Sequence, residues 1–202
     1  MRETFFKIAV ASVLLVFATP AGADKAEAKA HFKNGVELFK DANYEGALVE
    51  FKAAYEAQPH FKVRYNIGTS LYKLHRYVEA KAELDAYIAE GGDKIPQKDR
   101  LEVQGILYEI QSLIGTITVT CNVEGAQVTV NGKEAGPCPF TEPLQVNLGE
   151  HDVQVSAIGY KTFEQTVTVA GGKAVVVNAS LAPVSSPIVP GPAPEPAEPS
   201  SP

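Results

Sequence analysis

The sequence has 202 residues, of which 45% are hydrophobic and 21% are charged, and its formal net charge is -6. This hydrophobic fraction excludes a wholly disordered chain. The negative charge argues against nucleic acid as the main partner, because phosphates are neutralised by clustered Lys and Arg. Two Cys and four His, none in a close pair, leave little for a zinc site.

Residues 1–23 resemble a secretory signal peptide. Arg2 and Lys7 give a basic start, residues 8–17 form an apolar run, and residues 21–23 are small, as signal cleavage requires. The run is about half as long as a membrane-spanning helix, and no other segment is long enough. We therefore predict cleavage and export to the periplasm or cell surface of a bacterium, with retention of the segment as a membrane anchor as the alternative.

The segment 24–114 carries 13 Lys and Arg, 15 Asp and Glu, and 11 of the 17 aromatic residues. It is rich in the helix-forming residues Ala, Leu, Glu and Lys. A self-match at an offset of 33 residues predicts stacked helical hairpins. Small Gly and Ala residues recur where two helices would approach closely. The matched pairs include Gly35 with Gly68, Leu38 with Leu71, Tyr44 with Tyr77, Ala47 with Ala80, and Glu50 with Glu83.

These residues resemble the tetratricopeptide repeat. The family's small Gly, its Tyr-x-x-Ala and its closing Pro are met by Gly35, residues 44–47 and Pro59, whereas the second copy has two glycines in place of the Pro. The resemblance covers two repeats, at 28–60 and 61–93, which is fewer than a stable array needs. A capping helix over 96–113 is therefore predicted, with an apolar face formed by Leu101, Ile106, Leu107, Ile110, Leu113 and Ile114.

The resemblance implies a peptide-binding concave face formed by the first helix of each repeat. Lysines beside aromatic residues on this face would suit an acidic or C-terminal peptide of a protein partner in the cell envelope. The alternative is that these lysines only solvate a helix surface. The candidate groove residues are Lys29, Phe32, Lys33, Val36, Lys40, Lys62, Tyr65, Asn66, Thr69 and Lys73.

From Gly115 onward, apolar and polar residues alternate in short runs, and Asn131-Gly132 is a hairpin signal. Such runs predict antiparallel strands around one core, here a small sandwich over 115–182. The predicted fold class is thus a multidomain α + β protein, with N-terminal α-helical hairpin repeats followed by a small antiparallel β-sandwich. The clearest runs lie at residues 116–121, 127–130, 151–155, 166–169 and 175–181.

Several motifs in this half resemble the PEGA domain, in their order along the chain. Residues 123–126 read Val-Glu-Gly-Ala, so Val123 replaces the Pro of the name-giving motif. The resemblance implies a non-catalytic envelope or surface module, sometimes suggested to hold surface layers or polysaccharide. A surface protein that binds carbohydrate or peptidoglycan through the sandwich is therefore the alternative to an adaptor. The other matching motifs lie at residues 128–132, 136–140, 148–153 and 158–160.

The two cysteines, Cys121 and Cys138, both lie in the β half. In an exported protein they are predicted to form a disulfide, which would add about 3 kcal/mol in the chain-entropy model. Two buried thiols are the alternative.

No catalytic, cofactor-binding or metal site is predicted, and we expect a protein that is not an enzyme. His151 and Asp152 are adjacent on a strand, so their side chains should point to opposite faces and not form an orienting pair. The glycines between strands have no following helix to bind phosphate.

The segment 183–202 holds 8 of the 14 prolines and is otherwise mostly Ala, Ser and Glu. This composition predicts a disordered, solvated tail. A spacer is the simplest interpretation, and a ligand for a partner or a tether to the cell wall are the alternatives.

Overall fold

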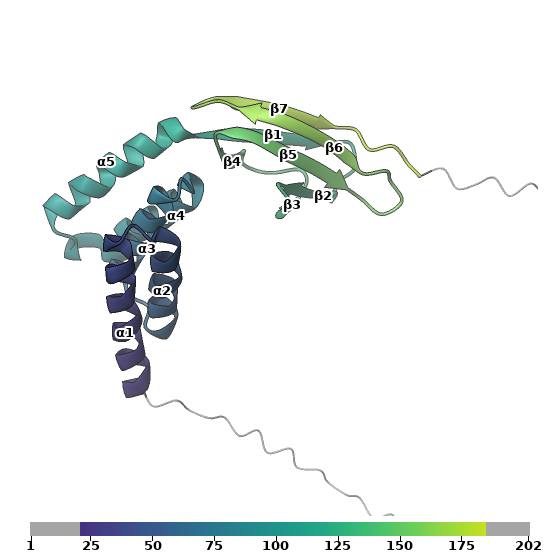
Figure 1. Ribbon diagram of the computed structural model, residues 1–202. Coiled ribbons are helices and arrows are strands. Elements are labelled where there is room, and N and C mark those ends of the chain that lie inside the picture. Colours follow the sequence, from purple (N-terminus) through teal and green to yellow (C-terminus); the bar gives the residue numbers. More distant parts are fainter. Residues whose placement is uncertain (1–20, 185–202) are drawn as a thin grey trace, which may run out of the picture. The chain divides into compact units, whose positions relative to one another are not determined.

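The computed structural model describes residues 21–184 and divides the chain into two compact units, one ending at Val103 and the other beginning at Gln104. Figure 1 shows the helices of the first unit and the strands of the second. The predicted signal peptide and Pro-rich tail lie almost entirely outside the described residues. Within the described range, no helix combines the length and apolar character needed to cross a bilayer.

Two helical hairpins make up most of the first unit. The second helix of the first hairpin also lies against the first helix of the second hairpin. The elements are α1 (Ala21–Lys40) and α2 (Tyr44–Ala57), then α3 (Phe61–Lys73) and α4 (Tyr77–Gly91), followed by the short 3-10 helix η1 (Gly92–Lys94) and by α5 (Gln97–Leu113).

The 33-residue offset recurs in the backbone of the two hairpin turns. Ala42 and His75 occupy equivalent positions and adopt positive φ angles of 58° and 59°. Asn43 caps α2: its Oδ1 accepts a hydrogen bond from the Gly46 N–H at 3.0 Å. The equivalent residue before α4 is Arg76, whose side chain makes no such cap. The two turns therefore share a backbone path while differing in side-chain chemistry.

Each hairpin depends on a close approach at a glycine. A Cβ atom placed on Gly35 would lie 2.7 Å from ring atoms of Phe51, and one on Gly68 would lie 2.8 Å from Leu84. Phe51 is 1% exposed and Leu84 is fully buried, so neither side chain has free space into which it can withdraw. Both pairs are related by the 33-residue offset. The small residues of the repeat are therefore required by packing.

Arg64 of α3 connects the two hairpins. Its guanidinium is 2.8 Å from carboxylate oxygens of Glu83 and Glu90 in α4, and it lies over the ring of Tyr55 in α2 at 4.4 Å from the ring centroid. The Arg64 side chain is 21% exposed, so solvent screens these contacts only partly. One side chain thus holds three helices together.

The start of α5 packs against the second hairpin. The Tyr65 hydroxyl donates a hydrogen bond to Glu102 at 2.7 Å, and Val103 is fully buried. Leu101, which the sequence placed on the apolar face of this helix, is instead 57% exposed. Leu101 and Val103 are two residues apart, about 200° around a helix, so both cannot face the same neighbour.

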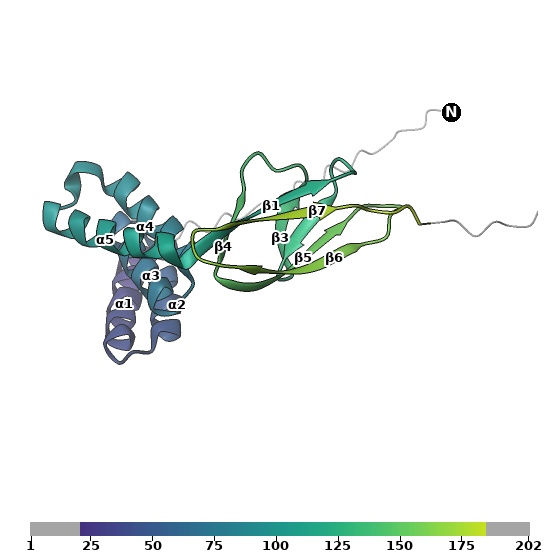
Figure 2. The same ribbon diagram turned by 90° about the horizontal axis from the view of Figure 1, so that it is seen from above.

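The second unit consists of two sheets with a shared core. One sheet has the order β4-β1-β7 and the other the order β3-β2-β5-β6. Figure 2 shows these strands from above. The core is rich in valine, with Val128, Val153, Val155 and Val177 fully buried. The strands are β1 (Ile114–Cys121), β2 (Gln127–Val130), β3 (Lys133–Pro137), β4 (Leu144–Asn147), β5 (Gly149–Ser156), β6 (Phe163–Val169) and β7 (Ala174–Ala179).

All ladders are antiparallel except the one between β1 and β7, which is parallel. The alternating pattern predicted antiparallel strands, which is wrong for this one pair. The turn before β7 fixes the direction, because the Gly172 N–H donates to the Ile114 carbonyl at 3.0 Å and the Thr116 N–H donates to the Lys173 carbonyl at 3.1 Å. These bonds place the beginning of β7 beside the beginning of β1, so the two strands run in the same direction.

The predicted disulfide between Cys121 and Cys138 is confirmed. It joins the end of β1 in one sheet to the segment after β3 in the other. Cys138 is 2% exposed, and its backbone N–H also donates to the Ala126 carbonyl at 2.8 Å. The bridge therefore closes one end of the shared core.

Replacing Gly68 with Ala should destabilise the helical unit by about 1–3 kcal/mol, because the new methyl group overlaps Leu84. Gly105 of α5 is the matched control: a Cβ there meets nothing within 4 Å, so Gly105→Ala should be neutral or stabilising by up to about 1 kcal/mol. Urea unfolding followed by circular dichroism at the helical wavelength measures both. Equal effects of the two variants would contradict the packing role of Gly68.

Reducing the disulfide should lower the stability of the β unit by about 2–4 kcal/mol. The measurement is calorimetry of the purified protein with and without reductant, together with the Cys121→Ser/Cys138→Ser double variant. The helical transition of the same sample is the internal control, since the only two cysteines of the chain lie in the β unit. An unchanged β transition would show that the bridge adds no stability.

Candidate functional site

A pocket of about 320 Å³ opens on the helical unit between α1, the end of α2 and the start of α3. Its floor is apolar and includes Ala28, Phe32, Ala54 and Val63. The Phe32 ring is held by Phe51, with ring centroids 5.7 Å apart. The pocket therefore depends on the same Phe51 that packs on Gly35.

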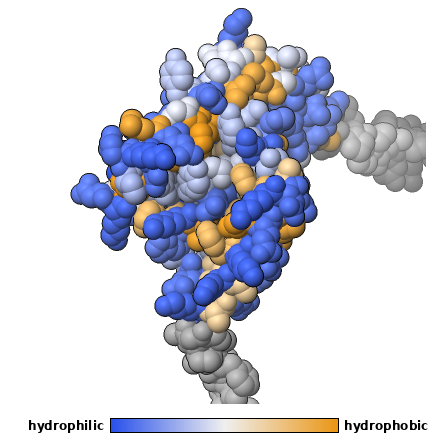
Figure 3. Space-filling view, turned by 60° about the vertical axis from the view of Figure 1, so that its left-hand side comes forward, coloured by the Kyte–Doolittle hydropathy of each residue, from blue (hydrophilic) through white to orange (hydrophobic). Residues whose placement is uncertain are grey.

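Cationic and polar side chains surround this floor, and no carboxylate of residues 21–184 lines the pocket. The ammonium groups of Lys25, Lys29 and Lys62 form no ion pair with any residue of the described chain. His60 and Gln58 come from the turn between α2 and α3. The His60 Nδ1 accepts the Lys62 N–H at 3.2 Å, which fixes the ring at the start of α3. Small apolar patches among charged side chains are visible on the face shown in Figure 3.

Three of the ten candidate groove residues, Lys29, Phe32 and Lys62, line this pocket. The polar groups of three others are used inside the unit: Tyr65 donates to Glu102, Asn66 to the Lys62 carbonyl and Thr69 to the Tyr65 carbonyl. Burial, together with the Glu102 hydrogen bond, raises the pKa of Tyr65 well above its usual range.

The remaining four candidates do not line the pocket. Lys33 lies 3.8 Å from Glu37, and Val36, Lys40 and Lys73 stand elsewhere on α1 and α3. Sequence reasoning missed the polar lining residues Lys25, Gln58 and His60 and the apolar ones Ala28, Ala54 and Val63. The one signal in the sequence was that Gln58 and His60 flank Pro59, which closes the first repeat.

His31 connects α1 to α2 next to the pocket residue Phe32. Its Nδ1 is 2.8 Å from a Glu50 carboxylate oxygen, and its Nε2 is 3.8 Å from Glu27. The hydrogen bond to Glu50 is the main cause that raises the pKa of His31 above its ordinary value. Protonation of this side chain therefore strengthens the contact between the two helices.

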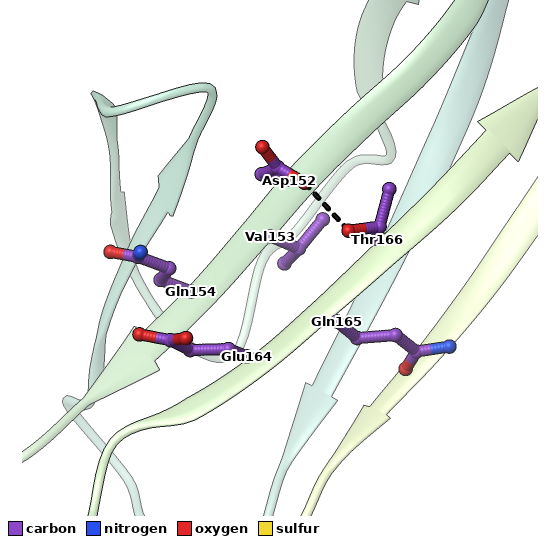
Figure 4. Close-up of a pocket in the computed structure, with 6 residues that line it drawn as sticks. All are labelled: Asp152, Val153, Gln154, Glu164, Gln165 and Thr166. Atoms are coloured by element: carbon purple, nitrogen blue, oxygen red, sulfur yellow. Dashed lines mark hydrogen bonds between the residues drawn. The ribbon is translucent and has the colours of Figure 1, made fainter.

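A second depression, of about 300 Å³, lies on the outer face of β5 and β6 and is polar. Figure 4 shows Asp152 and Thr166 side by side, joined by a 2.7 Å hydrogen bond from the Thr166 hydroxyl, with Gln154 next to Glu164. Among the residues that the structure describes, no aromatic side chain lines this depression. It offers hydrogen bonds and negative charge to a ligand without a surface for stacking.

His151 and Asp152 face opposite sides of β5, as strand alternation predicted: His151 is 6% exposed and Asp152 is exposed. The His151 Nε2 lies 2.7 Å from the Asn147 carbonyl and its Nδ1 lies 2.9 Å from the Asn131 amide nitrogen. With the Asn147 carbonyl as acceptor and the Asn131 amide as donor, Nε2 donates and Nδ1 accepts. Both ring nitrogens of His151 are thus bound within the β unit.

The comparisons with known proteins concern the β half. Residues 114–185 match the family described as the PEGA domain, which confirms the resemblance predicted for this part of the chain. The match covers less than half of the sequence, and the helical unit lies outside it. No curated protein matches the chain.

The His31 contact predicts a pH dependence with a definite sign. Because the folded-state pKa of His31 is raised, its contribution to stability is full below the ordinary value of about 6.5 and is lost as the pH rises through the folded-state value. The helical unit of the native protein should therefore melt at a higher temperature than that of the His31→Gln variant. This difference in melting temperature should be larger at about pH 5.5 than at about pH 8.5. A difference that does not change with pH would contradict this assignment.

Proposed function

We propose that this protein is a non-enzymatic, exported adaptor of the cell envelope. In this proposal α1 to α4 form two tetratricopeptide-like repeats, and the pocket between α1 and α3 binds a segment of a partner protein. The PEGA unit engages or packs on another envelope component.

The envelope assignment draws on three features of the chain. The PEGA match indicates an extracellular or envelope-associated module. The disulfide is of the kind that persists in oxidising compartments. The N-terminal 23 residues have the basic start, apolar run and small residues of a secretory signal.

The pocket between α1 and α3 is the observation that carries the binding role. It combines an apolar floor with three lysines that have no counter-charge among its lining residues. Such a site favours a ligand with an apolar side chain beside one or more carboxylates, because the apolar group is desolvated while the ammonium groups neutralise the charge. An extended acidic segment of a partner protein has this chemistry.

The competing function is carbohydrate or peptidoglycan binding by the β unit. The polar depression at Asp152, Gln154, Glu164 and Thr166 supports it, since these side chains can exchange hydrogen bonds with hydroxyl groups. The adaptor is the better-supported proposal, because the depression has no aromatic side chain on which a sugar ring could stack.

The test is in situ crosslinking from a photoreactive residue placed at Phe32, in cells that carry either the native chain or a charge-reversed chain. The double variant Lys29→Glu/Lys62→Glu should lower partner capture by about tenfold or more, because attraction becomes repulsion. The control Lys52→Glu/Lys133→Glu makes the same change in net charge at exposed lysines outside the pocket and should capture normally.

Equal capture by both double variants would reject the lysine-lined pocket. Co-sedimentation of the protein with cell-wall polysaccharide, lost on Gln154→Ala/Glu164→Ala but kept in Lys29→Glu/Lys62→Glu, would favour the competing function.

A further inference from the structure

The outer edge of β7 has unpaired backbone groups. β7 pairs with β1 in a parallel ladder. The Lys173 carbonyl accepts a hydrogen bond from the Thr116 N–H at 3.1 Å, and the Ala179 carbonyl accepts one from the Asn122 N–H at 3.4 Å. Alternate residues of such a strand face the same neighbour, so the odd-numbered residues of β7 bond β1. The N–H and C=O groups of Ala174, Val176 and Asn178 therefore point away from the sheet, and no other described strand pairs with them.

The other three edges of the two sheets are protected by different means. β3 has Lys133 and Glu134, a bulge at Ala135 in its ladder with β2, and Pro137. β4 is only four residues long, and β6 carries Glu164. Short strands, charges, prolines and bulges are the devices that prevent edge-to-edge pairing.

β7 has none of these devices. Its sequence, Ala-Val-Val-Val-Asn-Ala, contains no charge and no proline, its register with β1 is regular, and Val176 is 57% exposed. β7 is thus the edge on which another strand can be added without loss of an existing contact.

The whole sheet that ends in β7 is uncharged. β1, β4 and β7 contain no Asp, Glu, Lys or Arg, whereas the carboxylates of the β3-β2-β5-β6 sheet include Glu134, Glu150, Asp152 and Glu164. Two copies of a chain with a net charge of -6 repel each other over most of their surface. The charge-free sheet is where this repulsion is weakest.

We propose that β7 pairs antiparallel with β7 of a second copy, so that two three-stranded sheets become one sheet of six strands. The two-fold axis passes beside Val176, which then faces its own equivalent, while Ala174 faces Asn178 of the other copy. All three residues present their free N–H and C=O groups to the partner, so each facing pair exchanges two hydrogen bonds. An exposed Val–Val contact is buried at the centre, and no charged side chains oppose each other.

Sedimentation velocity of the purified protein over a range of concentrations tests this pairing. The native protein should be a concentration-dependent dimer. Val176→Pro removes an outward N–H without disturbing the ladder to β1, and Val176→Lys places two ammonium groups face to face, so both variants should be monomeric. Val184→Lys is the matched control, since Val184 is 55% exposed and lies outside β7, and it should dimerise normally.

Cysteine crosslinking tests the register. Val176→Cys should give a disulfide-linked dimer on mild oxidation, and a mixture of Ala174→Cys with Asn178→Cys should crosslink, whereas Ala174→Cys alone should not. Circular dichroism confirms that each variant is folded.

Two results would overturn the proposal. One is a native protein that remains monomeric up to about 1 mM. At this concentration even a dimer with a free energy of association of only about -4 kcal/mol would be observed. The other is a dimer that persists in both Val176→Pro and Val176→Lys.

Discussion

The close approach of paired helices at Gly35 and Gly68 is the constraint on which the helical unit depends. A helix can come this near to another only where no side chain intervenes, and the facing side chains, Phe51 and Leu84, fill the space left by the missing Cβ. The first pair also fixes the pocket, because Phe51 supports the Phe32 ring that forms its floor. The packing of Phe51 inside the first hairpin thus also determines the shape of the candidate binding surface.

Much of this fold follows from local patterns. The 33-residue repeat predicted two hairpins because the same small and large residues recur at helical spacing. In the β half, alternation predicted the main strands, and the two cysteines predicted a bond that the structure confirms. Such features depend on near neighbours along the chain, so they can be read from sequence.

Other features depend on contacts that no local pattern contains. The parallel direction of β7 is fixed by the turn at Gly172, which bonds Ile114, almost 60 residues earlier. The exposure of Leu101 follows from which face of α5 Val103 occupies. At the candidate pocket, Lys29, Phe32 and Lys62 could be predicted from repeat positions, whereas His60 joins them through its place at the start of α3.

The parallel pairing of β1 with β7 also bears on how the β unit forms. The first strand of the unit is completed by its last, so Ile117 meets Val175 only after nearly the whole unit has been synthesised. Contacts between residues so distant in sequence are slow to form, because a long loop must close before any of them is gained. The hairpins of the helical unit need only neighbouring residues. The disulfide spans only 17 residues, all of them before β7, so it anchors the end of β1 independently of that last pairing.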